Sequence, residues 1–350
     1  MVKKENILKY LSPTARLIFL LLLWSCSNET IEQKLEKAIL EGNQNQVNGL
    51  LEKGADPNGK NQEGQPLLFV ALQKGLIPLA TTFLEKGADP NIRDKTGEPL
   101  LYFASRHRHV GLVQALLKKK ADVNVKMEYG ATPLMVASGI GITEIVGLLL
   151  KHNPDINAQN QEGKTALFYA TQGGHSDIVK ALAQYGADLN IQTKEGKTAL
   201  MEAAVAGKGE ILQVLFEVGA EADFKTPGGG TALFYASNQP KSEAVKILLE
   251  KGAQPNTQLL NGATPLFFAS GGGHLESVTL LLENGAKVNI PTTQGATPLL
   301  VASQQGHTEV AKLLLQHGAD VHIKTIDGKT PLDVAKNIEI VRLLTKAGAK

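Results

Sequence analysis

The chain has 350 residues, 43% of them hydrophobic and 20% charged, a composition typical of folded proteins that excludes wholesale disorder. Its 36 Lys and Arg residues against 34 Asp and Glu give a formal charge of +2, without the basic excess that nucleic-acid binding requires. Four of those basic residues and one acidic residue lie in residues 1–25, so the remainder carries a formal charge of −1. The single cysteine excludes an internal disulfide framework and a cysteine-rich zinc site. We therefore expect no nucleic-acid partner.

The N-terminus has the layout of a secretory signal peptide. Basic residues up to Arg16 precede an apolar block, Leu17–Trp24, and small polar residues follow the block. The block has eight residues, whereas about 20 are needed to span a bilayer, so we do not expect a transmembrane helix. Residues 1–25 are predicted to be a signal peptide of the lipoprotein type.

The segment from Leu23 to Cys26 (LWSC) resembles the lipobox of bacterial lipoproteins, in which the cysteine receives a diacylglycerol and becomes the acylated N-terminus. The resemblance implies lipidation of Cys26, a durable membrane anchor because two or three acyl chains hold a protein firmly. The implied location is the bacterial cell envelope, with the outer membrane favoured over the inner because Ser27 is not an aspartate. Ordinary cleavage after Ser27, which would give a secreted protein, is one alternative, and a hydrophobic segment that does not direct secretion is the other.

Nine glycines recur at a constant spacing of 33 residues, which indicates a repeat architecture. They are Gly64, Gly97, Gly130, Gly163, Gly196, Gly229, Gly262, Gly295 and Gly328. A second marker, Gly-Ala-Asp-x-Asn and close variants of it, keeps the same period from Gly54 to Gly318. Two markers in register over nine periods predict an array of similar units.

The residues of each unit predict two helices and a turn. Thr132 is a suitable N-cap, and Pro133 fits the first helical position, where its missing N–H costs nothing. An apolar stripe follows, then a glycine-containing break such as that at Gly174, then a second helix with a Val/Leu stripe. The glycine of Gly-Ala-Asp fits the left-handed position that ends a helix.

These residues resemble the ankyrin repeat over roughly residues 30–350. The resemblance implies an all-α ankyrin-repeat solenoid of about ten helix-turn-helix units with β-turn fingers, in which neighbouring units close each core. We expect the ankyrin-repeat domain to span residues 26–350. It would comprise an N-terminal capping repeat (30–61), eight full repeats (62–325) and a shortened C-terminal capping repeat (326–350).

Four residues depart from the glycine pattern. Lys120 and Asn153 replace the glycine that ends a second helix, and the left-handed conformation is strained for lysine. Arg108 and Pro240 replace the glycine between helices, so we expect those turns to differ in shape.

No nucleophile elbow, phosphate-binding loop, dinucleotide fingerprint or HExxH motif occurs in the sequence. Four histidines share one repeat position and are predicted to stabilise turns rather than to bind a metal: His109, His175, His274 and His307. We expect no enzymatic activity, no cofactor and no metal.

Ankyrin repeats bind proteins through the fingers and the exposed side of the first helix, so the resemblance implies a protein partner in the concave groove. The candidate basic residues are Arg93, Lys95, Lys126, Lys164 and Lys197. The candidate aromatic residues are Phe103, Tyr129, Tyr169, Tyr235 and Phe268. Each set keeps a second interpretation: a mixed solvated surface for the basic residues, and packing between helix and finger for the aromatic residues. The expected protein is a monomeric, membrane-anchored scaffold, or alternatively a secreted or translocated effector that binds host proteins.

Overall fold

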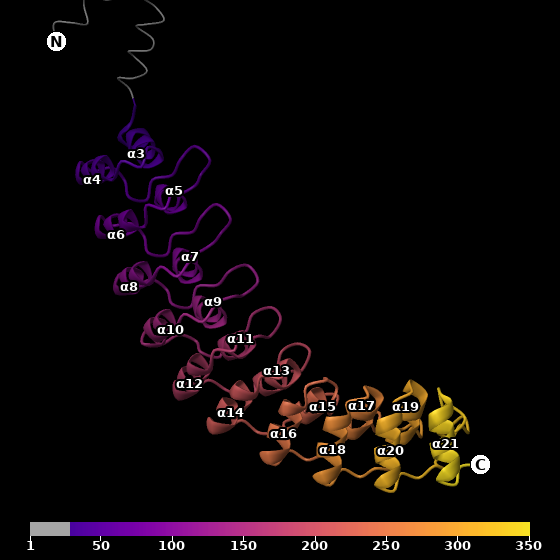
Figure 1. Ribbon diagram of the computed structural model, residues 1–350. Coiled ribbons are helices and arrows are strands. Elements are labelled where there is room, and N and C mark those ends of the chain that lie inside the picture. Colours follow the sequence, from indigo (N-terminus) through magenta and orange to yellow (C-terminus); the bar gives the residue numbers. More distant parts are fainter. Residues whose placement is uncertain (1–28) are drawn as a thin grey trace, which may run out of the picture. The chain divides into compact units, whose positions relative to one another are not determined.

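The computed structural model describes residues 29–350, so the predicted signal peptide and Cys26 lie outside the described residues. The chain divides into two compact units, with the boundary between Met127 and Glu128. The described residues form 19 α-helices and no β-strand, which confirms the all-α repeat fold. Within each unit the first helices of successive pairs lie in one row and the second helices in another (Figure 1).

Unit 1, described from residue 29 to Met127, contains three helix pairs. They are α3 (Ile31–Leu40) with α4 (Gln44–Glu52), α5 (Leu67–Gln73) with α6 (Ile77–Glu85), and α7 (Leu100–Arg106) with α8 (Val110–Lys118). The fingers before α5 and α7 close through isolated antiparallel bridges, Lys60 with Pro66 and Arg93 with Pro99.

Unit 2, Glu128–Lys350, contains six helix pairs and a final single helix. The first three pairs are α9 (Pro133–Gly139) with α10 (Thr143–Leu150), α11 (Ala166–Gly173) with α12 (Ser176–Gln184), and α13 (Ala199–Ala206) with α14 (Gly209–Glu217). The next three are α15 (Ala232–Ser237) with α16 (Ser242–Glu250), α17 (Pro265–Gly271) with α18 (Leu275–Glu283), and α19 (Pro298–Gln305) with α20 (Thr308–Gln316). The last helix is α21 (Ile338–Lys346).

Threonine side chains begin the first helices of unit 2. Thr132 Oγ1 accepts a hydrogen bond from Met135 N at 3.2 Å, and Thr165 accepts one from Phe168 N at 3.3 Å. An N-cap bond of this kind stabilises a helix by about 1 kcal/mol. In unit 1, Pro99 stands at the N-cap of α7 and supplies no such bond.

The core repeats with the same period as the sequence. In the second helices the fully buried leucines include Leu116, Leu149, Leu182, Leu215, Leu248, Leu281 and Leu314, each 33 residues after the last. Burying one leucine side chain contributes about 1.5–3 kcal/mol. No helix pair can bury both of its faces alone, so each repeat depends on its neighbours within the unit.

Polar side chains link consecutive repeats at two positions. The asparagine of Gly-Ala-Asp-x-Asn accepts a backbone hydrogen bond from the next repeat, as in Asp188 N to Asn157 Oδ1 at 2.9 Å. His175 Nε2 donates to Gly139 O of the preceding repeat at 3.1 Å, and His307 does the same to Gly271 O at 3.0 Å. The predicted structural role is therefore confirmed for these two histidines.

The departures from the glycine pattern have different outcomes. Lys120 and Asn153 have φ angles of 62° and 52°, so both take the expected left-handed conformation. The expectation for Arg108 was wrong, because its φ of 62° reproduces the turn that glycine makes elsewhere. Pro240 cannot adopt a positive φ, and α15 before it has only 6 residues.

The final repeat has only one helix. Pro331 to Val334 form a hydrogen-bonded turn where the other repeats have their first helix. Asn337 caps α21 by accepting from Ile340 N at 2.9 Å, and its Nδ2 donates to Gly306 O at 3.3 Å. The predicted repeat boundaries themselves remain a prediction.

Candidate functional site

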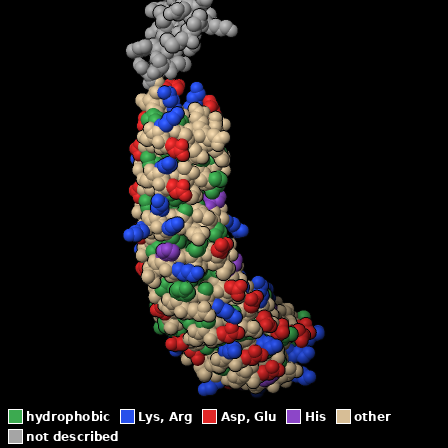
Figure 2. Space-filling model, turned by 90° about the vertical axis from the view of Figure 1, so that its left-hand side faces the viewer, with side chains coloured by type: hydrophobic (Ala, Val, Ile, Leu, Met, Phe, Trp, Pro, Cys, Tyr) green, Lys and Arg blue, Asp and Glu red, His purple; other side chains and the backbone are tan. Residues whose placement is uncertain are grey.

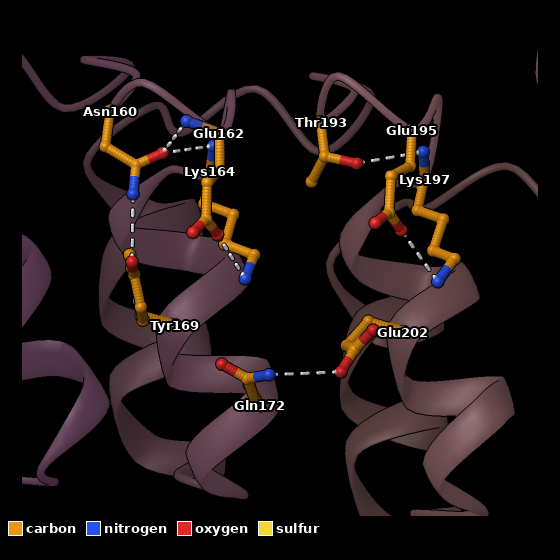
Figure 3. Close-up of polar contacts among 9 residues, drawn as sticks. All are labelled: Asn160, Glu162, Lys164, Tyr169, Gln172, Thr193, Glu195, Lys197 and Glu202. Atoms are coloured by element: carbon orange, nitrogen blue, oxygen red, sulfur yellow. Dashed lines mark hydrogen bonds and ion pairs between the residues drawn. The ribbon is translucent and has the colours of Figure 1, made fainter. Parts of the chain in front are cut away.

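Two fingers of unit 2 hold residues that line a groove. Asn160 Oδ1 accepts from the backbone N of Glu162 at 3.0 Å and of Lys164 at 2.9 Å, which fixes the first finger (Figure 3). In the next finger Thr193 Oγ1 accepts from Lys197 N at 3.3 Å. The two fingers are joined through Lys194 N and Glu162 O at 2.9 Å. Lys164 and Lys197 thus occupy equivalent places one repeat apart.

A groove of about 460 Å³ lies between these fingers and helices α11 and α13. We call it the Lys164–Glu202 groove. It is lined by Gln161, Glu162, Lys164, Phe168, Gln172, Thr193, Lys194, Glu195, Lys197, Glu202 and Val205. Figure 3 shows the two lysine side chains extending from the fingers toward the helices, where Gln172 and Glu202 lie.

Both lysines of the groove are ion-paired with glutamates of their own fingers. Lys164 Nζ lies 2.6 Å from Glu162 Oε2, and Lys197 Nζ lies 3.0 Å from Glu195 Oε2. The hydrogen bond with Glu162 is the main cause that raises the pKa of Lys164, and the negative charge of Glu202 adds to it. The hydrogen bond from Lys197 likewise lowers the pKa of Glu195. The positive charge that the sequence suggested is therefore largely compensated.

The two lysines also lie over aromatic rings. Lys164 Nζ is 5.6 Å from the ring centre of Phe168, and Lys197 Nζ is 5.9 Å from that of Tyr235. Contacts at this distance add a modest attraction and favour lysine side chains that stay inside the groove.

Glu202 differs from the other carboxylates of the groove. Its side chain extends from α13, is half-buried, and accepts a long hydrogen bond of 3.4 Å from Gln172 Nε2 on α11. Among the described residues, no cation lies within ion-pair distance of it. Glu202 was not predicted as a site residue, although its position six residues after the repeat glycine carries an aromatic residue or valine in the other full repeats.

The aromatic candidates pack against the preceding repeat. Tyr169 lies against the backbone of α9 at Gly139, and its hydroxyl accepts from Asn160 Nδ2 at 2.9 Å. The rings of Phe268 and Phe234 meet edge to face with centres 4.6 Å apart, and those of Phe103 and Phe69 do so at 5.7 Å. Phe103, Tyr169, Tyr235 and Phe268 are all half-buried, so their rings serve packing and leave only part of each side chain accessible.

Tyr129 is the exception among the aromatic candidates. Its side chain is 66% exposed at a fingertip, where its carbonyl accepts from Gln161 N at 2.9 Å. It is not among the residues that line the Lys164–Glu202 groove.

The basic candidates of unit 1 are mostly engaged in local contacts. Arg93 Nη1 donates to Gly97 O at 2.9 Å and to Lys126 O at 3.2 Å, so its guanidinium braces two fingers. Gln159 makes the equivalent pair of bonds in unit 2. Lys95 Nζ lies 2.9 Å from Glu63 Oε2, while the Lys126 side chain is exposed. Of the ten candidates, the structure brings together Arg93 and Lys95 along one groove of unit 1, and Lys164 and Lys197 along the Lys164–Glu202 groove of unit 2.

The remaining surface is mixed. Figure 2 shows one face of the molecule, on which acidic and basic side chains are interspersed rather than gathered into a patch of one sign. Between residues 29 and 350, no three His, Cys, Asp or Glu side chains are grouped so that they could hold a metal ion. Over the same range, every helix is too short or too polar to cross a bilayer.

Paired helices with β-turn fingers and a groove along the first helices define a protein-interaction scaffold of the ankyrin type. The family described as ankyrin repeats matches residues 35–127, 67–160, 124–193, 200–292, 233–325 and 288–350. The chain belongs to the ankyrin-repeat family.

Solved structures support the same assignment. The ankyrin-repeat domain of Bcl-3, described as a unique member of the IkappaB protein family, is 29% identical with a TM-score of 0.57, covering 62% of this chain and 100% of that one. The human ASB11 ankyrin-repeat domain is 28% identical with a TM-score of 0.57, covering 63% of this chain and 99% of that one. No curated protein matches with comparable significance.

Proposed function

We propose that this protein is a scaffold that binds a protein partner in the Lys164–Glu202 groove and is anchored to the bacterial cell envelope by a lipid on Cys26. The observation that carries the binding site is the groove itself. Its charged side chains are held in place by ion pairs and finger hydrogen bonds before any partner arrives. A preformed site loses little conformational entropy on association, which favours binding.

The size and lining of the groove fit a segment of polypeptide. A volume of about 460 Å³ falls within the usual range for ligand sites and leaves room for side chains of an extended chain. Phe168 and Val205 offer apolar contact, while charged and amide side chains supply directional contacts.

A steric test addresses the groove directly. Gln172 is exposed and lines the groove, so Gln172→Trp should fill it while leaving the buried face of α11 intact. Gln184→Trp, at an exposed position of α12 away from the groove, is the matched control. In a pull-down from envelope extracts we expect Gln172→Trp to lose partners that the wild type and the control retain. Identical partner sets for all three proteins would contradict the proposal.

The anchor rests on the segment from Leu23 to Cys26 and on Cys26 being the sole cysteine of the chain. Lipidation would concentrate the scaffold at a membrane surface, preferably the outer membrane, and so favour partners found there. Mass spectrometry of the mature protein tests this. An acylated Cys26 at the N-terminus supports the anchor, whereas an unmodified N-terminus at Asn28 favours the secreted or translocated effector.

A further inference from the structure

Two charged residues that line the groove, Lys194 and Glu202, have no ion pair among the described residues. Glu162 and Glu195 are each paired with a lysine of their own finger, and Figure 3 shows both lysine side chains extending from the fingers toward the helices. Glu202 lies on the helix side of the groove without a paired cation. A charged carboxylate that is half-buried gains from a cationic partner, because a local environment drier than bulk water strengthens their attraction.

We propose that Glu202, which Gln172 contacts through a hydrogen bond, receives an arginine side chain from an extended segment of the partner protein. This inference rests on the proposed function of the groove and specifies what the groove selects. The lysine count of the fingers suggests an acidic partner, but an acidic side chain that entered as far as the helices would meet Glu202.

Arginine fits these residues better than lysine does. Gln172 Nε2 donates to Glu202 Oε1, and Figure 3 shows the side-chain carbonyl oxygen of Gln172 turned away from the carboxylate. The two oxygens of the Glu202 carboxylate match the planar fork of a guanidinium, which can donate to both, whereas an ammonium is a single point charge. Phe168 and Val205 line the same groove and can contact the methylene groups of the arginine.

The preference for arginine is confined to one repeat. At the position of Glu202, the preceding repeat has Tyr169 and the following repeat has Tyr235. An acidic residue at this position therefore marks a single place along the array, which would fix the register of a bound segment.

Peptide selection by phage display tests the inference without knowledge of the natural partner. A library of random 12-residue peptides is selected on the immobilised full-length chain in mild detergent. Peptides that bind the wild type but not Gln172→Trp are kept as groove binders. We expect arginine to be enriched among them, and we expect Glu202→Gln to weaken their binding about tenfold or more, as loss of a charged hydrogen bond does.

Two variants and one control separate charge from folding. Glu202→Lys should select acidic peptides instead of arginine-containing ones. Glu202→Tyr carries the residue that neighbouring repeats have at this position, so it should fold and still lose the arginine preference. Glu210→Gln removes an exposed carboxylate of α14 that accepts from Ser176 Oγ outside the groove, and it should bind as the wild type does.

The outcomes distinguish the two proposals. Groove binders without arginine enrichment, or with equal affinity for the wild type and Glu202→Gln, would overturn the arginine inference and leave the groove as a binding site. Failure to find any peptide that Gln172→Trp excludes would count against both.

Discussion

Lys120 is the residue at which the structure predicts a gain in stability from a single substitution. It follows α8 with a φ of 62°, at the position where most other repeats have glycine. The left-handed conformation costs a residue with a side chain about 1–2 kcal/mol. Glycine is more flexible in the unfolded chain, and this subtracts about 0.5–1 kcal/mol from the gain. We therefore expect Lys120→Gly to raise the free energy of unfolding by about 0.5–1 kcal/mol.

The surroundings support the view that the backbone alone causes this cost. At the equivalent Gly54 and Gly87, an added Cβ would meet no atom within 4 Å. Lys120 itself is exposed, and its N–H donates to Leu117 O at 3.0 Å, a bond that glycine retains. No crowding is relieved and no contact is lost by the change.

Chemical unfolding in urea, followed by circular dichroism, measures the difference. Lys119→Gly is the matched control, because Lys119 has a φ of −85° and glycine there brings only its entropic cost. The control should lose about 0.5–1 kcal/mol. If Lys120→Gly were also less stable than the wild type, the strain argument would be refuted.

Two further changes have expected outcomes. His175→Ala removes the donor to Gly139 and should cost about 1 kcal/mol in thermal unfolding, whereas His175→Lys should retain most of that stability, because Lys208 at the same repeat position makes the equivalent bond at 2.6 Å. Burial raises the pKa of the Glu98 carboxyl even though the Arg106 guanidinium opposes this. The folded protein therefore holds this proton more tightly than the unfolded chain does. The protonated Glu98 carboxyl therefore contributes to the free energy of unfolding. This contribution is fully present below the unfolded-state pKa of about 4.3 and is lost as the pH rises through the higher folded-state pKa. Glu98→Gln, which introduces the residue that position 65 has, should remove this loss. Urea midpoints of both proteins below and above that range would test it, and equal pH dependence would contradict it.

The fold could be predicted from the sequence because the residues that begin the first helix and end the second helix of each repeat recur every 33 residues. Thr132 and its equivalents begin first helices, and the glycines near the ends of second helices take positive φ as predicted. Arg108 could not be foreseen, because residue preference alone argues against a left-handed arginine. The neighbouring repeats impose the turn, and their packing exceeds the strain of one residue.

The groove was predicted less completely than the fold. Lys164 and Lys197 were identified, and the structure places both on one groove. Their partners were not foreseeable, because lysine and glutamate two residues apart on a finger can point together or apart. Side-chain geometry decides which charged residues are paired, and it leaves Lys194 and Glu202 without an ion pair in the groove.

Variation along a repeat array is of two kinds, and the structure separates them. Where Lys208 stands for histidine, or Gln159 for Arg93, the new residue donates to the equivalent backbone carbonyls, so variation there preserves the stack. Where Glu202 stands for the aromatic residue or valine of the other full repeats, a carboxylate replaces an apolar side chain, and its hydrogen bond from Gln172 is long, at 3.4 Å. A carboxylate at a position that is apolar in every other full repeat adds nothing to the packing of the stack, so it is better explained by what binds at that charge than by the stability of the array.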